Sequence, residues 1–418
     1  MQPQHPLHAL VSFALLSASL HAVAPSDWPQ FRGPGADGIT PAQNLPVQWD
    51  ATKGVAWKVP IPGKGWSSPV LVHGRIYLTS AIPDAAGEIT LNVLCLDQAS
   101  GTLLWNREVF RPEAGDARAM HRKNSAASPT PLCVDDRLYV HFGHMGTAAL
   151  DLEGNVLWRQ NSHKYKPVHG TGSTPVLVGD SLIFGADGAK DPCLIALDAK
   201  TGAIRWQKPR NTPAKKQFSF CTPQVIQVDG QTQVISPHSG FVSAYSPADG
   251  TELWKVAYGE GYSVVPRPVY AHGLLFLSSG FDSAKLYAIR PEGAAGDVTE
   301  THVAWTLKKG APHTPSVVVV GDQLFCVADS GIASCIDART GEVHWSERLE
   351  GNFSASPFAS GDRIYFLNES GSTFVVKASK TFELLATNAL SERTLASPAP
   401  TEGALFIRSE EHLFKLVP

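Results

Sequence analysis

The sequence predicts an all-β fold made of eight repeated units, and three observations support this prediction. Charged residues are only 17% of the chain, while 36 Gly and 31 Pro indicate many tight turns. A hairpin signature recurs along the chain, and it is often followed by a third strand, a Gly turn and a strand that closes on Trp. No 3.6-residue helical period accompanies it. Units of about 40 to 50 residues with four strands each are typical of the blades of a β-propeller.

The hairpin that opens each unit is clearest at residues 68–77. Ser68 and Pro69 precede an apolar run, the chain turns at Gly74, and a second apolar run ends at Tyr77. The same opening recurs at Pro129, Pro175, Pro223, Pro268, Pro315, Pro357 and Pro398. The count of these openings predicts eight blades.

The second half of the unit carries an Asp, a Gly four residues later and a Trp eight residues later. The clearest copies are Asp97, Gly101 and Trp105; Asp198, Gly202 and Trp206; and Asp337, Gly341 and Trp345. Gly suits a turn position with positive φ, and Trp can fill the space between neighbouring blades. Five copies in register, two of them slightly edited, argue against a chance hairpin.

The two ends of the repeat array complement each other. The last unit stops after its third strand, at residues 412–417, and lacks a closing Trp strand. Residues 55–59, around Trp57, form a fourth strand with no blade before it. Pairing of the two would complete the last blade and remove the exposed edges of an open array.

The N-terminal region indicates export. Residues 9–20 are apolar and residues 22–24 read Ala-Val-Ala, which matches a signal-peptidase site although the preceding segment has no Lys or Arg. The apolar run is shorter than the roughly 20 residues that a membrane span needs, and no longer one follows. We expect a signal peptide at 1–24, an extension packed on the propeller at 25–48, the propeller at 49–418, and a soluble periplasmic or secreted protein.

From Trp28 to the C-terminus the chain resembles the PQQ-binding-like β-propeller repeat proteins of exported bacterial type. Residues 27–34 look like the leader that precedes such propellers, and residues 65–69 look like their first inner strand. The resemblance implies two different functions. Pyrroloquinoline-quinone (PQQ) dependent alcohol dehydrogenases are enzymes, whereas the propeller lipoprotein of the outer-membrane assembly machine is a binding scaffold, and fold alone does not choose between them.

The sequence departs from both relatives. The dehydrogenases carry an adjacent Cys-Cys pair beside the quinone, but none of the six cysteines here are adjacent, and no Cys-x-x-Cys-His haem motif is present. No local motif anchors the dehydrogenases' Ca²⁺ ligands or catalytic acids, and no lipid-acceptor Cys follows the predicted cleavage point. These departures favour a chain without a cofactor, with PQQ and Ca²⁺ as the alternative.

Candidate ligand-binding residues emerge when the start of each inner strand is compared across blades. The residue before the anchoring Pro is a small hydroxyl in seven blades, and Arg267 in the fifth. One residue earlier, His313 and Pro266 replace the small residues of the other blades. We therefore expect Arg267 and His313 to bind an anionic or carbonyl-bearing ligand at one mouth of the channel. Further candidates at nearby offsets are Tyr262, His169, Lys123, Asn124, Asn352 and Arg393. The alternative is that Arg267 pairs with an acid such as Asp282 and ties two blades together.

Cysteine and aspartate patterns leave two further questions. Cys326 and Cys335 are symmetric about residues 330–331, so a two-residue turn there would bring them within disulfide range. The alternative is that both thiols stay reduced. Asp187 and Asp191 match no calcium-binding spacing, and we expect a solvated loop and no metal site.

The leading functional hypothesis is a non-catalytic propeller that binds an envelope protein, a glycan or a small ligand at its channel face. The alternatives are a PQQ-dependent alcohol or sugar dehydrogenase and a structural module of an envelope complex. A formal net charge of −3 gives no electrostatic reason to expect nucleic acid or an anionic membrane as partner. We expect a monomer.

Overall fold

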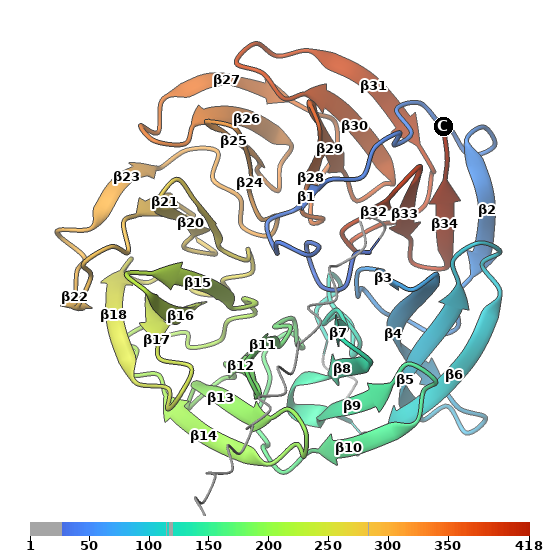
Figure 1. Ribbon diagram of the computed structural model, residues 1–418, viewed down its shortest axis with the longest axis horizontal. Helices are drawn as coiled ribbons and strands as arrows, with labels where there is room; N and C mark the ends of the chain where they lie inside the picture. Colours follow the sequence, from blue (N-terminus) through green and yellow to red (C-terminus); the bar gives the residue numbers. More distant parts are fainter. Residues whose placement is uncertain (1–26, 114, 117–119, 283) are drawn as a thin grey trace, which may run out of the picture.

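The computed structural model describes residues 27–113, 115–116, 120–282 and 284–418. In this part of the chain eight twisted sheets stand around a central axis (Figure 1). The helical content of the described residues is a single 3₁₀ turn, η1 (Gly143–Met145). The predicted all-β, eight-bladed propeller is confirmed.

Each blade is an antiparallel sheet whose first strand lies at the axis and whose last strand lies on the perimeter (Figure 1). Blade 1 contains β3 (Val70–Val72), β4 (Arg75–Pro83), β5 (Ile89–Asp97) and β6 (Leu103–Phe110). Blade 2 contains β7 (Leu132–Val134), β8 (Arg137–His141), β9 (Thr147–Asp151) and β10 (Val156–Gln160). Blade 3 contains β11 (Val176–Val178), β12 (Ser181–Ala186), β13 (Cys193–Asp198) and β14 (Ile204–Pro209). Blade 4 contains β15 (Gln224–Val228), β16 (Gln231–His238), β17 (Phe241–Tyr245) and β18 (Glu252–Ala257), with β22 (Gly296–Asp297) added parallel to β18.

The remaining blades follow the same order. Blade 5 contains β19 (Val269–Ala271), β20 (Leu274–Ser278), β21 (Leu286–Ile289) and β23 (Val303–Leu307). Blade 6 contains β24 (Val318–Val320), β25 (Gln323–Val327), β26 (Ile332–Asp337) and β27 (Val343–Arg348). Blade 7 contains β28 (Phe358–Ser360), β29 (Arg363–Leu367), β30 (Ser372–Lys377) and β31 (Leu384–Ala389), with β1 (Ile39–Thr40) parallel to β28. Blade 8 contains β32 (Ala399–Thr401), β33 (Ala404–Arg408), β34 (His412–Leu416) and β2 (Val55–Pro60).

The ring closes through blade 8, as the sequence predicts. Strand β2 pairs antiparallel with β34, with Val59 opposite Leu413, so two segments from opposite ends of the chain form one sheet. Within the described residues, no helix has the length and hydropathy needed to cross a bilayer.

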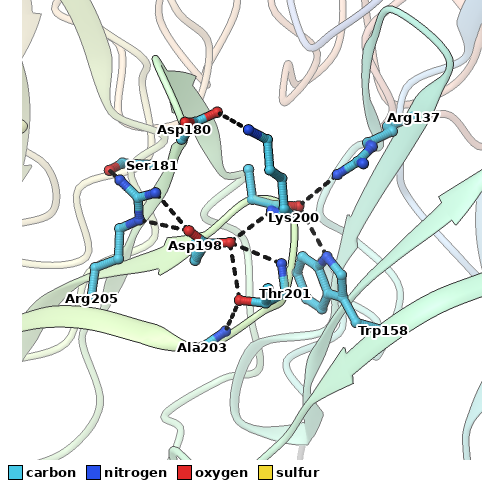
Figure 2. Close-up of polar contacts among 10 residues, drawn as sticks. Arg137, Trp158, Asp180, Ser181, Asp198, Lys200, Thr201, Ala203 and Arg205 are labelled. Carbon is cyan, nitrogen blue, oxygen red and sulfur yellow. Dashed lines mark hydrogen bonds and ion pairs between the residues drawn. The ribbon is translucent and has the colours of Figure 1, made fainter.

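Packing between blades explains the Asp, Gly and Trp of the repeat. Trp158 of blade 2 donates from Nε1 to the carbonyl of Ala199 in blade 3, at 3.0 Å, and Arg137 donates to the same oxygen (Figure 2). Gly202 of that turn has φ +75°, and a Cβ on it would lie 2.5 Å from the Trp158 ring. Gly is therefore required both for the backbone angle and for the space that the indole occupies.

Asp198 fixes the shape of the same turn (Figure 2). Its Oδ1 accepts hydrogen bonds from the backbone N–H groups of Lys200 and Thr201, at 3.0 and 2.9 Å, and Arg205 binds its Oδ2. The Arg205 guanidinium, together with the Thr201 hydroxyl, lowers the pKa of Asp198 to about 2. The repeated Asp is thus a turn-forming residue and is ionised at any physiological pH.

A segment that precedes the propeller crosses the centre of the ring (Figure 1). We call residues 27–38 the leader. Trp28, 1% exposed, exchanges backbone hydrogen bonds with Leu71 of β3, and the carbonyl of Pro29 accepts from Cys133 of β7. The leader therefore lies across the inner strands of blades 1 and 2. The predicted signal peptide at 1–24 lies outside the described residues.

Candidate functional site

The inner strands carry a chain of hydroxyls at one structural position. In every blade this position is two residues before the inner strand begins, and its occupants are Ser68, Thr130, Thr174, Thr222, Arg267, Ser316, Ser356 and Ser397. The residues that precede Pro129 and Pro315, Ser128 and Thr314, lie two residues before this position, so the predicted register is wrong in blades 2 and 6. The prolines at 129 and 131 offered two registers in blade 2, and Ser316 has no Pro after it.

Hydrogen bonds between blades define the position. The backbone N–H of Ser68 donates to Thr130 Oγ1, that of Thr130 to Thr174 Oγ1, and that of Thr174 to Thr222 Oγ1, each at 3.0 Å. On the other side of Arg267 the same link runs through Ser316, Ser356 and Ser397 at 2.8–2.9 Å. Hydroxyls of six blades therefore link neighbouring blades, which gives the recurring Ser or Thr a structural role.

Arg267 interrupts this chain and has a different role from the one expected. It is 3% exposed; its Nε donates to the carbonyl of Pro223, and its Nη1 donates to the carbonyl of Phe31 at 2.8 Å and to Gln30 Oε1 at 3.4 Å. Arg267 therefore joins blades 4 and 5 and binds the leader. It donates mainly to backbone carbonyls, whereas Asp282 accepts a hydrogen bond from the Tyr262 hydroxyl.

A second buried arginine, Arg32, belongs to the leader itself and attaches it to other parts of the ring. Arg32, 3% exposed, donates to the carbonyls of Pro357, Asp37 and Val317. Burial lowers the pKa of Arg32 to about 10 and that of Arg267 to about 9, so both guanidiniums remain charged at pH 7. Two cations with carbonyl partners thus fasten the leader across the channel.

Above the leader lies a cavity of about 810 Å³ at the centre of the propeller. Phe31 of the leader lines it, as do residues of the hydroxyl position, among them Thr174 and Thr222. Its other walls come mainly from the loops that lead from the last strand of one blade to the inner strand of the next, with Phe281 and Asp329 added from loops within blades 5 and 6. The leader thus provides the floor and the inter-blade loops provide the rim.

Aromatic rings form an arc along one side of the cavity. Ring centroids are 5.3 Å apart between His121 and His169, 5.4 Å between His169 and Phe218, 5.4 Å between Phe218 and Tyr262, and 6.0 Å between Tyr262 and Phe281. We call these five residues the aromatic arc; all of them line the cavity. Phe281, 51% exposed, is the outermost.

Only His169 and Tyr262 of this arc were expected from the sequence. A signal for a third member was present, because His169, Phe218 and Tyr262 lie four or five residues before the hydroxyl position in three successive blades. His169 has φ +66°, a conformation that is unfavourable for a residue with a side chain and that recurs at functional sites. Its carbonyl accepts from the backbone of His121 and from Asn124.

The other predicted site residues are divided among three places. Lys123 and Asn124 line the same cavity, and Lys123 pairs with Glu369 at 2.6 Å. Asn352 and Arg393 line a separate surface depression together with Glu369. Arg267 and His313 are not among the cavity-lining residues.

His313 lies just outside the cavity. Its ring packs on Phe281 at 5.4 Å, and its backbone N–H donates to Asp329. Because the register of blade 6 is shifted, His313 and Arg267 do not occupy equivalent positions. The prediction that they bind one ligand together is therefore not supported, whereas four of the remaining six candidates do line one cavity.

Cys326 and Cys335 are both free and do not face each other. The turn between β25 and β26 has three residues, 329–331, and not the two expected. Cys326 therefore lies opposite Ser334, and Cys335 lies opposite Phe325. A register change of one residue sends the two side chains to opposite faces of the blade. The predicted disulfide is wrong for this reason. Burial raises the pKa of both thiols to about 12.

The prediction of a solvated loop is wrong for Asp187, whereas Asp191 is exposed as expected. The Asp187 side chain is 4% exposed and lies 3.0 Å from Arg210 Nε, whose own side chain is fully buried. Arg210 also donates to Ser236 of the next blade. The pair therefore ties blade 3 to blade 4.

The repeat is shared with a known family of propeller proteins. The family model described as outer membrane protein assembly factor BamB matches residues 39–167 and 291–381. The chain belongs to this family of PQQ-like propellers. A BamB from Legionella pneumophila is 23% identical over 206 residues, which are 48% of this chain and 49% of that protein. A lanthanide-dependent methanol dehydrogenase from Methylorubrum extorquens is 29% identical over 154 residues, 33% of this chain and 24% of that enzyme. The chain thus matches half or less of the length of these curated relatives.

Among solved structures, BamB from Moraxella catarrhalis aligns with 87% of this chain and 97% of its own, with a TM-score of 0.60 and 12% identity. This likeness shows a shared PQQ-like propeller fold.

The cavity residues do not fit a quinone with a Ca²⁺ ion. No group of three or more His, Cys, Asp or Glu side chains in the described residues is arranged to hold a metal. Asp329 is the one carboxylate among the described lining residues, and its oxygens already accept from the backbone of His313 and from the backbone and hydroxyl of Thr314. The cavity wall therefore does not supply the set of oxygen ligands that Ca²⁺ requires.

Proposed function

We propose that this PQQ-like propeller is an exported, non-catalytic binding protein whose ligand enters the cavity above the leader. The observation that carries the proposal is the cavity itself: a space of about 810 Å³, open toward the inter-blade loops and floored by Phe31. Binding sites for small ligands are clefts of about 300–1,000 Å³ with mainly apolar walls and a few polar groups. The aromatic arc and the ring of hydroxyls supply both.

Two features favour binding over catalysis. Asp329 is engaged in holding its own loop, as described above. Glu369, behind the rim, pairs with Lys123 and accepts from Ser354 at 2.6 Å. Asp329 accepts through both of its oxygens, and Glu369 accepts through Oε1, so each carboxylate already holds a neighbouring loop in place.

The relatives support export and an envelope setting. The family model and two of the similar proteins bear the name outer membrane protein assembly factor BamB, and the predicted signal peptide agrees with it. We propose a monomeric periplasmic or secreted protein that brings its ligand to, or recognises it in, the cell envelope. An envelope protein docking on the loop face remains compatible with the same cavity.

Filling the cavity tests the proposal. Val265 is half-buried, lines the cavity, and its side chain can be enlarged without removing a hydrogen bond. Val265→Trp should abolish ligand-induced stabilisation in a thermal-shift screen of sugars, peptides and organic acids, while Val265→Leu should retain it. Equal ligand responses in wild type and Val265→Trp would contradict the proposal.

Reconstitution tests the catalytic alternative. Purified protein is mixed with PQQ and Ca²⁺, and quinone absorbance and dye reduction with alcohols and sugars are measured. We expect no turnover. Turnover that Val265→Trp eliminates would instead establish a PQQ-dependent dehydrogenase.

A further inference from the structure

The cavity wall presents hydroxyl protons that have no acceptor in the described part of the protein. Thr130, Thr174, Thr222, Ser356 and Ser397 each accept one inter-blade N–H, and none of them donates to another described group. All five line the cavity, and the first four are 3–4% exposed. A hydroxyl has one proton to donate, and a buried donor without an acceptor is destabilising. The wall is therefore a ring of donors suited to a ligand rich in acceptor oxygens.

Positive charge lies beneath the floor. Arg32 and Arg267 take part in no ion pair in the described residues, and Arg267 donates to the carbonyl of Phe31, whose residue lines the cavity. Arg122 at the rim adds a further cation that is unpaired in the described structure. Charge in a low-dielectric surrounding is weakly screened, so an anion above Phe31 is attracted to these guanidiniums.

The aromatic arc supplies the apolar part of the recognition. It spans the loops of blades 2 to 5, so it can contact several rings of one ligand in succession. Trp66, from the loop that leads into blade 1, also lines the cavity, and the Arg393 guanidinium is 5.4 Å from its ring centroid. Ring faces pack against flat, weakly polar surfaces, including the C–H faces of sugar rings.

These three features select one ligand class. We propose that the cavity binds the end of an acidic oligosaccharide, a short chain of pyranose rings that carry carboxylates. This inference rests on the proposed binding function. The carboxylate and ring oxygens accept from the wall hydroxyls, the negative charge lies above the buried arginines, and the sugar rings stack along the arc. Because Phe31 of the leader lines the floor, we expect the cavity to take a chain end and not a chain that passes through. A protein segment is less well matched, because its backbone N–H groups would meet a wall that offers donors.

Calorimetric titration with a hexuronate trisaccharide and with the neutral hexose trisaccharide of the same linkage tests the ligand class. We expect the acidic sugar to bind about ten-fold more tightly or better, a free-energy difference of about 1.4 kcal/mol, and its affinity to fall in high salt. Equal affinities would overturn the proposal for an acidic ligand and leave the binding function intact.

Two matched variants test the wall. Thr222→Val and Ser316→Ala each remove a hydroxyl that accepts an inter-blade N–H, but only Thr222 lines the cavity. Both variants should lose similar thermal stability, whereas only Thr222→Val should lower the affinity for the acidic trisaccharide, by about five-fold or more. An unchanged affinity in Thr222→Val would overturn the proposal.

Other outcomes distinguish a wrong ligand class from a cavity that binds no ligand. Binding of an aromatic carboxylate but of neither sugar, blocked in Val265→Trp, would refute the saccharide and retain the cavity as a binding site. Absence of any response that depends on Val265 would refute both.

Discussion

Gly202 offers a direct test of how neighbouring blades are joined. We expect Gly202→Ala to destabilise the protein by about 2–5 kcal/mol, from two separate causes. A left-handed φ of +75° costs an L-residue about 1–2 kcal/mol. The new Cβ would also lie 2.5 Å from Trp158 Cε3 and 2.8 Å from its Cδ2, and overpacking typically costs about 1–3 kcal/mol.

Gly230 is the matched control. Its φ is +74°, and a Cβ added to it would meet no atom within 4 Å. Gly230→Ala should therefore lose only the backbone part, about 1–2 kcal/mol. Urea unfolding followed by tryptophan fluorescence measures both variants, and a double variant that combines Gly202→Ala with Trp158→Phe measures their coupling. Equal destabilisation by Gly202→Ala and Gly230→Ala would refute the proposed docking of the indole on glycine.

Three further predictions concern buried polar groups. Arg267→Met should destabilise the protein by about 2–4 kcal/mol, because it leaves the carbonyls of Phe31 and Pro223 without a donor. Limited proteolysis of this variant should then cut the leader. A leader that stays intact would contradict this role of Arg267. Burial lowers the pKa of His141 from 6.5 to about 3, so between these pH values the unfolded state binds more protons than the folded state. The free energy of unfolding should therefore fall as the pH falls through this window, by about 1.4 kcal/mol per pH unit. His141→Gln should flatten that slope in urea titrations at several pH values. Cys326 should react with an alkylating reagent only after unfolding, and mass spectrometry should give the same mass with and without reductant; a two-dalton difference would indicate a disulfide.

The cavity was only partly foreseeable. Lys123, Asn124, His169 and Tyr262 could be placed near a channel mouth because they precede inner strands at similar offsets. Phe281 could not, because it follows β20 in a different loop and reaches the arc through a backbone bridge to Tyr262. The role of Arg267 was missed because its partners, Gln30 and Phe31, are more than 230 residues away in the sequence.

The sequence by itself determined the repeat, the number of blades and the closure of the ring. Each depends on local chemistry that a short window of sequence displays: a Gly where φ is positive, a Trp at a set spacing, and a missing strand that the other end of the chain supplies. The tertiary structure alone decided the register of blades 2 and 6, the separation of Cys326 from Cys335, and the path of the leader across the channel. A one-residue difference in turn length reverses a side chain's face, and contacts between the leader and distant blades leave no periodic trace in the sequence. The recurrence of hydroxyls before the inner strands was visible in the sequence, but only the structure revealed that six of them accept an inter-blade N–H.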